Sequence, residues 1–96
     1  MDAKELKEMR KWDALLNKTG RRSLSANERY HVFFDGGGVG IHCSSLNIGD
    51  DDPDTLFLRD RTGKIITFIR RSSVKSIDVC KDNFWTVIGN IYTRDD

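Results

Sequence analysis

The sequence predicts an α+β, mainly β fold in which an N-terminal helix packs on a strongly curled antiparallel sheet of five to six strands. Three observations predict it. In the first part of the chain, apolar residues recur at three- and four-residue spacing, as in a helix. Farther along, apolar and polar residues alternate, as in strands, and these β-type runs follow one another at a spacing of roughly 8–12 residues. One helix followed by short strands is typical of a small barrel or roll with the helix over one face or end. Open two-layer packing is the alternative.

The length and composition favour one ordinary globular domain spanning residues 1–96, with 38% hydrophobic and 32% charged residues. Sixteen basic and fifteen acidic side chains leave a net charge of +1, so no single-sign field indicates a polyanionic partner or an anionic membrane. No run approaches the roughly 18 apolar residues of a membrane helix, and the charged start is unlike a signal peptide. Two cysteines without an export signal favour a reducing, cytoplasmic location.

A helix is expected at about residues 3–18. Asp2 and Glu5 have the spacing of a capping box, and Thr19-Gly20 supplies a stop signal. The apolar stripe predicts that four side chains are buried against the sheet: Leu6, Met9, Leu16 and Trp12.

Strands are expected at about 30–34, 39–43, 56–60, 65–70, 75–79 and 85–92. The first two read as a hairpin around Gly36-Gly37-Gly38, and the next two as a hairpin around the turn at 61–64. Residues 46–55 are predicted to be a polar loop. The strand at 65–70 is apolar on both faces, which predicts a central strand with one face on the core and the other under the helix or a partner.

The glycine cluster carries one family resemblance. Asp35-x-Gly37-x-x-Gly40 resembles the D/N-x-S-x-x-G element of PilZ domains, barrels that bind cyclic di-GMP. Those domains pair the element with an upstream R-x-x-x-R, whereas this chain has Arg21-Arg22 without an arginine at 25 or 26, and glycine replaces the serine. The cluster also lacks the spacing of a P-loop or of G-x-G-x-x-G. We therefore expect a wide hairpin tip that binds no nucleotide.

A second resemblance involves Ile69-Arg70-Arg71 and the strand that follows, which is similar to the I-R-G motif before the final strand of Sm-like RNA-binding proteins. The order of one helix and then about five strands is also Sm-like. Arg71 replaces the motif's glycine, and the family's first motif is not found in 39–60. The resemblance implies an SH3- or Sm-like outline for the small barrel and no more.

The candidate metal ligands do not form a recognised pattern. Asp50, Asp51, Asp52 and Asp54 lack the alternation of a calcium loop, so a solvated loop is expected, with a weak metal site or a docking site for a basic partner as alternatives. The soft or nitrogen ligands are His31, His42, Cys43 and Cys80. Adjacent residues in a strand point to opposite faces, so His42 and Cys43 cannot easily chelate together, and Cys43 is in phase with the expected core face. We expect no metal, no cofactor and no catalytic residues.

The expected partner-binding residues are Arg59, Arg61, Arg70 and Arg71, which the 56–71 hairpin separates into two basic spots. The rings available for stacking on bases are Tyr30, Phe57, Trp85 and Tyr92, and the sequence leaves their exposure open. We expect a non-enzymatic protein-binding module (a regulator, inhibitor or assembly subunit) that binds another protein, with self-association left open. Arg70 or Arg71 is the expected anchor. The alternative is a small-barrel nucleic-acid-binding protein that uses the arginine spots.

Overall fold

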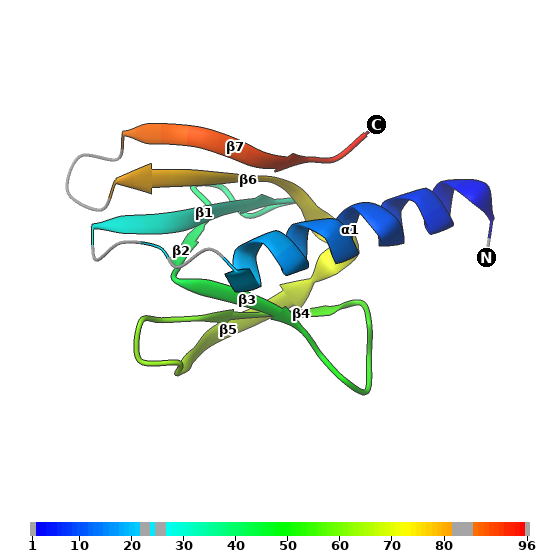
Figure 1. The fold of residues 1–96 in the computed structure, drawn as a ribbon, viewed down its shortest axis with the longest axis horizontal. Helices are drawn as coiled ribbons and strands as arrows, with labels where there is room; N and C mark the ends of the chain where they lie inside the picture. The colour runs from blue at the N-terminus through cyan, green and yellow to red at the C-terminus, as the bar shows by residue number, and fades with distance from the viewer. Residues whose placement is uncertain (1, 22–23, 25–26, 82–85, 96) are drawn as a thin grey trace.

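The computed structural model describes residues 2–21, 24, 27–81 and 86–95 and shows an α+β fold (Figure 1). One N-terminal helix packs on two antiparallel sheets, which confirms the predicted class. The elements in chain order are α1 (Ala3–Arg21), β1 (Glu28–Phe34), β2 (Ile41–Cys43), β3 (Ser45–Ile48), β4 (Thr55–Arg59), β5 (Ile65–Arg70), the short 3₁₀ helix η1 (Arg71–Ser73), β6 (Val74–Lys81) and β7 (Val87–Thr93).

The strands form two sheets instead of one curled sheet of five or six strands. A four-stranded sheet has the order β2-β1-β6-β7, and a three-stranded sheet has the order β3-β4-β5. The chain crosses from the first sheet to the second at Ser44 and returns through η1. The described strands do not close into a barrel.

Most of the predicted strands are confirmed within two residues, and the hairpins fold as expected. His31 lies opposite His42 in the β1–β2 hairpin, and Phe57 opposite Phe68 in the β4–β5 hairpin. The prediction of a polar loop at 46–55 is wrong at its start, because β3 occupies Ser45–Ile48. The start predicted for the last strand, at residue 85, lies outside the described residues.

The helix begins as predicted and ends later. The Asp2 Oδ1 atom accepts a 2.8 Å hydrogen bond from the Glu5 amide, as an N-cap should. The predicted stop at Thr19-Gly20 is wrong, since the helix continues to Arg21. One glycine costs a helix only about 1 kcal/mol, which is not enough to end it. No helix among the described residues is long and apolar enough to span a membrane.

The buried face of the helix is narrower than predicted. Trp12 and Leu15 are buried, whereas Met9 and Leu16 are half-buried and Leu6 is 43% exposed. The prediction for Leu6 is wrong because the first turns of α1 extend past the sheets (Figure 1). Among the described side chains of the helix, those of Trp12 and Leu15 are the ones buried in the core.

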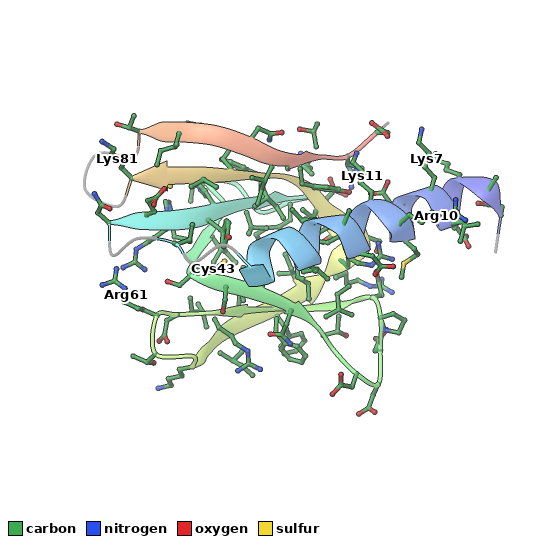
Figure 2. All side chains as sticks on the ribbon, viewed as in Figure 1. Lys7, Arg10, Lys11, Cys43, Arg61 and Lys81 are labelled. Atoms are coloured by element: carbon green, nitrogen blue, oxygen red, sulfur yellow. The ribbon has the colours of Figure 1, made fainter. Side chains whose placement is uncertain are left out.

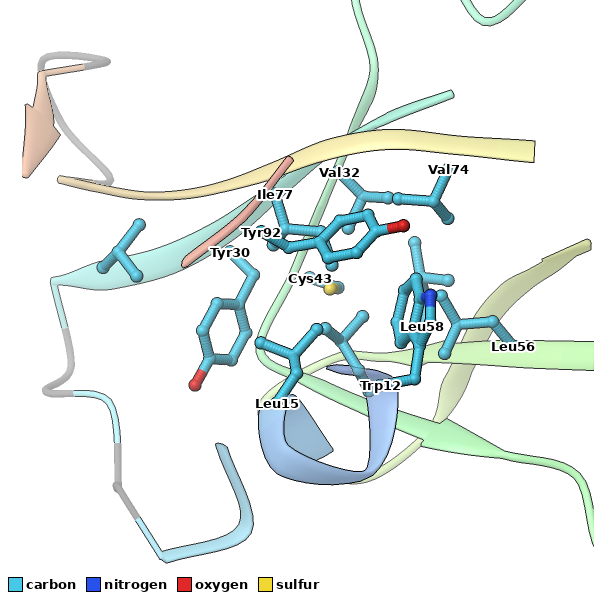
Figure 3. Close-up of a cluster of buried hydrophobic side chains, with 12 residues drawn as sticks. Trp12, Leu15, Tyr30, Val32, Cys43, Leu56, Leu58, Val74, Ile77 and Tyr92 are labelled. Carbon is cyan, nitrogen blue, oxygen red and sulfur yellow. The ribbon is translucent and has the colours of Figure 1, made fainter. Parts of the chain in front are cut away.

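The core lies between the two sheets and the helix, and both sheets contribute to it (Figure 3). Its buried side chains are Trp12, Leu15, Tyr30, Val32, Cys43, Leu46, Leu56, Leu58, Val74, Ile77, Val79 and Tyr92. Cys43 is buried on the core face, as its phase predicts, and this burial raises the pKa of its thiol to about 12. Burying each large apolar side chain contributes about 1.5–3 kcal/mol.

Strand β5 is not central. It pairs with β4 alone among the described strands and forms the edge of the three-stranded sheet. Ile69 packs against the core, while Ile65, Ile66 and Phe68 remain exposed. Apolar residues on both faces predicted a covered strand, and the protein itself covers only one face.

Candidate functional site

Strand β5 carries the largest group of exposed apolar side chains that the structure describes on one strand. Phe68 is 66% exposed, and Ile65 and Ile66 are also exposed. Phe68 lies opposite the half-buried Phe57 of β4, with ring centroids 6.1 Å apart. A sheet edge presents backbone N–H and C=O groups that can pair with another strand. The edge of β5 and the Ile66–Phe68 row beside it form one continuous surface, which we call the β5 edge (Ile65–Arg70).

Arg70 and Arg71, at the end of β5, both pair with Asp54 but differ in exposure. The Arg71 side chain is 13% exposed, its Nε donates to the Pro53 carbonyl at 3.1 Å, and its guanidinium lies 5.9 Å from the Trp12 ring centroid. The Arg70 side chain is 84% exposed, and its Nε lies 3.3 Å from Asp54 Oδ2. Arg71 therefore holds the neighbouring loop in place, while Arg70 is accessible to a partner.

The acidic loop uses two of its carboxylates within the protein. Asp52 Oδ1 accepts a hydrogen bond from the Asp54 amide at 2.9 Å, and Asp54 accepts bonds from the amide and hydroxyl of Ser72 at 2.9 and 3.1 Å. Asp50 and Asp51 are exposed. Across the parts of the chain that the structure describes, these carboxylates do not converge as a group of metal ligands. They shape the loop and tie it to η1.

Arg59 and Arg61 lie at the other end of the β4–β5 hairpin, so the four arginines occupy two separate places. Arg59 is half-buried, with Nε donating to Asn47 Oδ1 at 2.8 Å and Nη1 to the Gly63 carbonyl at 2.9 Å. Arg61 is exposed and lines, with Asp60, a hollow of about 430 Å³. Hydrogen bonds from Thr62 are the main reason that the pKa of Asp60 lies below its usual value. Arg59 thus supports the turn.

A groove of about 570 Å³ lies between the first half of α1 and the end of β7. Glu8, Arg71, Tyr92 and Asp95 are among the residues that line it. Both signs of charge are present, so the lining does not select an anion or a cation. We assign no ligand to this groove.

Asp35, the acidic residue of the PilZ-like element, is held by an internal ion pair. Arg94 donates to both of its carboxylate oxygens, at 3.0 and 3.1 Å, and Lys75 lies 4.0 Å away. The bond from Arg94 lowers the pKa of Asp35. Gly40 has φ +78°, and a Cβ there would lie 2.6 Å from the Val32 carbonyl oxygen. These glycine and aspartate residues have local structural roles, and the absence of nucleotide binding stays a prediction.

His31, His42 and Cys80 come together on the outer face of the four-stranded sheet. One ligand atom of each lies within 4.8 Å of the others, and this is the one such group of three that the described residues contain. The Cys80 Sγ lies 3.7 Å from His42 Nδ1. The sequence does not reveal this cluster, because the ligands that are adjacent in the chain are His42 and Cys43, which point to opposite faces of the strand. One signal was present in the sequence: successive side chains of a strand alternate between its two faces, so His31 and His42 are expected on the face opposite to that of the buried residues beside them.

Of the rings named from the sequence as available for stacking, those that the structure describes are buried or half-buried. Tyr30 and Tyr92 are buried in the core, and Phe57 is half-buried. Trp85 lies outside the described residues.

No protein-family model matches the chain, and no curated protein or solved structure matches it significantly.

Proposed function

We propose that the protein is a non-enzymatic protein-binding module that binds an extended segment of another protein along the β5 edge. The observation that carries this proposal is an edge strand whose exposed face is apolar. A peptide added to such an edge gains backbone hydrogen bonds from the edge and specificity from the side chains that alternate along it.

The regularity of β5 favours it over β7, the other edge strand with exposed apolar residues. The β6–β7 pairing contains two irregularities, at Ile77/Asp78 and at Val79/Cys80. The β4–β5 pairing contains one, at Leu58/Arg59 beside the turn. Bulges bend and twist an edge and so hinder pairing with a further strand. Strand β3, the other edge of the three-stranded sheet, packs against α1.

Charge favours a partner with acidic residues at both ends of its apolar segment. Lys64 is exposed just before β5, and Arg70 is exposed at its end. A second copy pairing antiparallel through β5 would bring Lys64 close to the other copy's Arg70, and such like charges across strands are destabilising. A different chain with carboxylates at both ends of its apolar segment would be attracted by Lys64 and Arg70. We therefore propose a separate partner and treat self-association as an outcome of the test.

Among the four arginines, Arg70 is the proposed anchor. A guanidinium carries five N–H donors, so the Arg70 contact with Asp54 through Nε leaves donors for a bidentate bond to a partner carboxylate. Arg59 and Arg71 are committed to bonds within the protein.

Nucleic-acid binding is the less favoured reading. Affinity for nucleic acid grows with the number of phosphates that basic side chains neutralise, and the bound Arg59 and Arg71 reduce that number. The exposed basic groups are also dispersed: Arg61 and Lys81 lie at one end of the molecule, and Lys7 and Arg10 at the other (Figure 2).

Two broader proposals accompany this function. The SH3- or Sm-like outline rests on two antiparallel sheets that share one core. A cytoplasmic location rests on Cys43 and Cys80, which do not form a disulfide bond.

A peptide selection tests the binding mode. A library of random ten-residue peptides is selected against the full-length protein, with Phe68→Lys as the negative selection and Val87→Lys as the matched control on β7. We expect enriched peptides with alternating apolar residues and acidic ends that bind wild type and Val87→Lys but not Phe68→Lys. Sedimentation of the peptide-free protein and titration with a mixed-sequence oligonucleotide complete the test. A dimer lost in Phe68→Lys would assign β5 to self-association, and oligonucleotide binding without peptide enrichment would contradict the proposal.

A further inference from the structure

The strand register explains how His31, His42 and Cys80 reach the same face. His31 lies directly opposite His42 in the β1–β2 pairing. Cys80 lies opposite Arg29 in the β1–β6 pairing, two residues from His31. Residues i and i+2 of a strand share a face, and opposing residues of paired strands share it too. The three side chains therefore come from adjacent strands and converge on the face that points away from the core.

The distance between two of the ligand atoms is that of a chelating pair. Zinc binds imidazole nitrogen at about 2.0–2.1 Å and thiolate sulfur at about 2.3 Å. With a tetrahedral angle, these bond lengths place nitrogen and sulfur about 3.6 Å apart. His42 Nδ1 and Cys80 Sγ are 3.7 Å apart.

The surroundings of His31 fit the role of a metal ligand. Its Nε2 lies 2.6 Å from the Val39 carbonyl oxygen, and a carbonyl can only accept, so Nε2 carries the proton. In this tautomer, Nδ1 is the nitrogen through which His31 would bind a metal. Histidine ligands commonly donate their other ring N–H to a backbone carbonyl, which fixes the tautomer and the ring orientation.

The ligands are packed closely together and largely shielded from solvent. The rings of His31 and His42 are stacked with centroids 4.1 Å apart. Cys80 is 1% exposed, and the Nε2 atom of His42 is shielded from solvent. Metal binding uses neutral imidazole and thiolate.

We propose that His31, His42 and Cys80 bind a zinc-type divalent ion on the outer face of the four-stranded sheet. Two imidazoles and one thiolate suit Zn²⁺, and three protein ligands leave the fourth position to water or to another added ligand. This site would revise the expectation, from the sequence, that the protein holds no metal. It lies on the other sheet from the β5 edge and does not depend on the proposed partner.

Cobalt and zinc titrations of the untagged, full-length, reduced protein test the site. Co²⁺ bound to a thiolate gives a charge-transfer absorption in the near ultraviolet. We expect this absorption to saturate at one equivalent, and Zn²⁺ to abolish it and to raise the thermal midpoint. Cys80→Ser and His42→Gln should weaken binding by about 100-fold or more, because loss of even an outer-shell partner costs about 10–100-fold.

Cys43→Ser is the matched control for Cys80→Ser, since Cys43 lies next to His42 on β2 but faces the core. It should keep the cobalt absorption and the rise in midpoint on adding zinc, whatever its midpoint without metal. X-ray absorption of the wild-type zinc complex, which needs no variant, should count one sulfur and two imidazole nitrogens. Absence of the thiolate absorption in the wild type, its loss in Cys43→Ser, or unchanged binding by a folded Cys80→Ser would each overturn the proposal.

Discussion

The hydroxyl of Tyr92, on the last strand, donates a hydrogen bond to the carboxylate of Glu8 on the N-terminal helix. The centroids of the Tyr92 and Trp12 rings lie 4.6 Å apart, and the Lys11 ammonium lies 5.0 Å from the centroid of the Tyr92 ring. Burial, and then the bond to Glu8, raise the pKa of Tyr92 above its ordinary value. These contacts join the two ends of the chain through one side chain.

Tyr92→Phe should therefore destabilise the protein and change its response to alkali. A hydrogen bond to a charged group contributes about 1.5–3 kcal/mol, and the half-buried Glu8 can regain water, so we expect a loss of about 1.5 kcal/mol at pH 7. Because its pKa is raised, the Tyr92 hydroxyl keeps its proton in the folded state at a pH where the unfolded state releases it, above about pH 10. Wild-type stability should thus fall from there upward.

Denaturant unfolding of wild type and Tyr92→Phe between neutral and alkaline pH measures both effects. The difference between the two proteins should shrink above the ordinary tyrosine pKa. A double-mutant cycle that combines Tyr92→Phe with Glu8→Gln measures the coupling free energy between the two side chains. A difference that does not change with pH would contradict this account of Tyr92.

Trp12→Ala and Leu6→Ala test how the helix docks. Trp12 is fully buried, so its truncation should cost about 3–5 kcal/mol. Leu6 is 43% exposed in the first turns of α1, so its truncation should stay within about 0.5 kcal/mol. Chemical denaturation with circular dichroism measures both changes. Equal costs would mean that the whole helix docks.

Arg71→Ala and Arg70→Ala should separate stability from binding. Arg71 bonds to Pro53 and packs near Trp12, so its removal should cost about 1–3 kcal/mol. Arg70 is mostly exposed, and its removal should leave the thermal midpoint nearly unchanged while weakening the selected peptide. Thermal melts and peptide titration of both variants measure this. A destabilised Arg70→Ala with intact peptide affinity would reverse the two roles.

Local signals in the sequence predict the elements that depend on local chemistry. Asp2 and Glu5 mark the start of the helix, and Gly63, with φ +87°, allows the turn between β4 and β5. Strand β3 has only four residues, with Leu46 its single buried side chain, so its alternation is too short to detect. Whether β5 is central or at an edge depends on the other strands, and its composition does not carry that information.

The candidate sites depend on distant residues, which a single sequence does not bring together. Arg70 and Arg71 are neighbours in the chain, and only the position of Asp54 and Trp12 shows that Arg71 is held internally. His31, His42 and Cys80 come from three strands, so their convergence requires the register of β1 with both β2 and β6.

Hydrogen–deuterium exchange of the backbone amides, with and without the selected acid-flanked peptide, tests the central claim most directly. The β5 edge should gain protection at residues 65–70, while β2 and β7, the edges of the other sheet, stay unchanged. The Phe68→Lys variant should show no gain, and Val87→Lys should behave as wild type. Protection centred on residues 41–43 or 87–93, or peptide binding without protection of 65–70, would contradict the assignment of β5 as the docking strand.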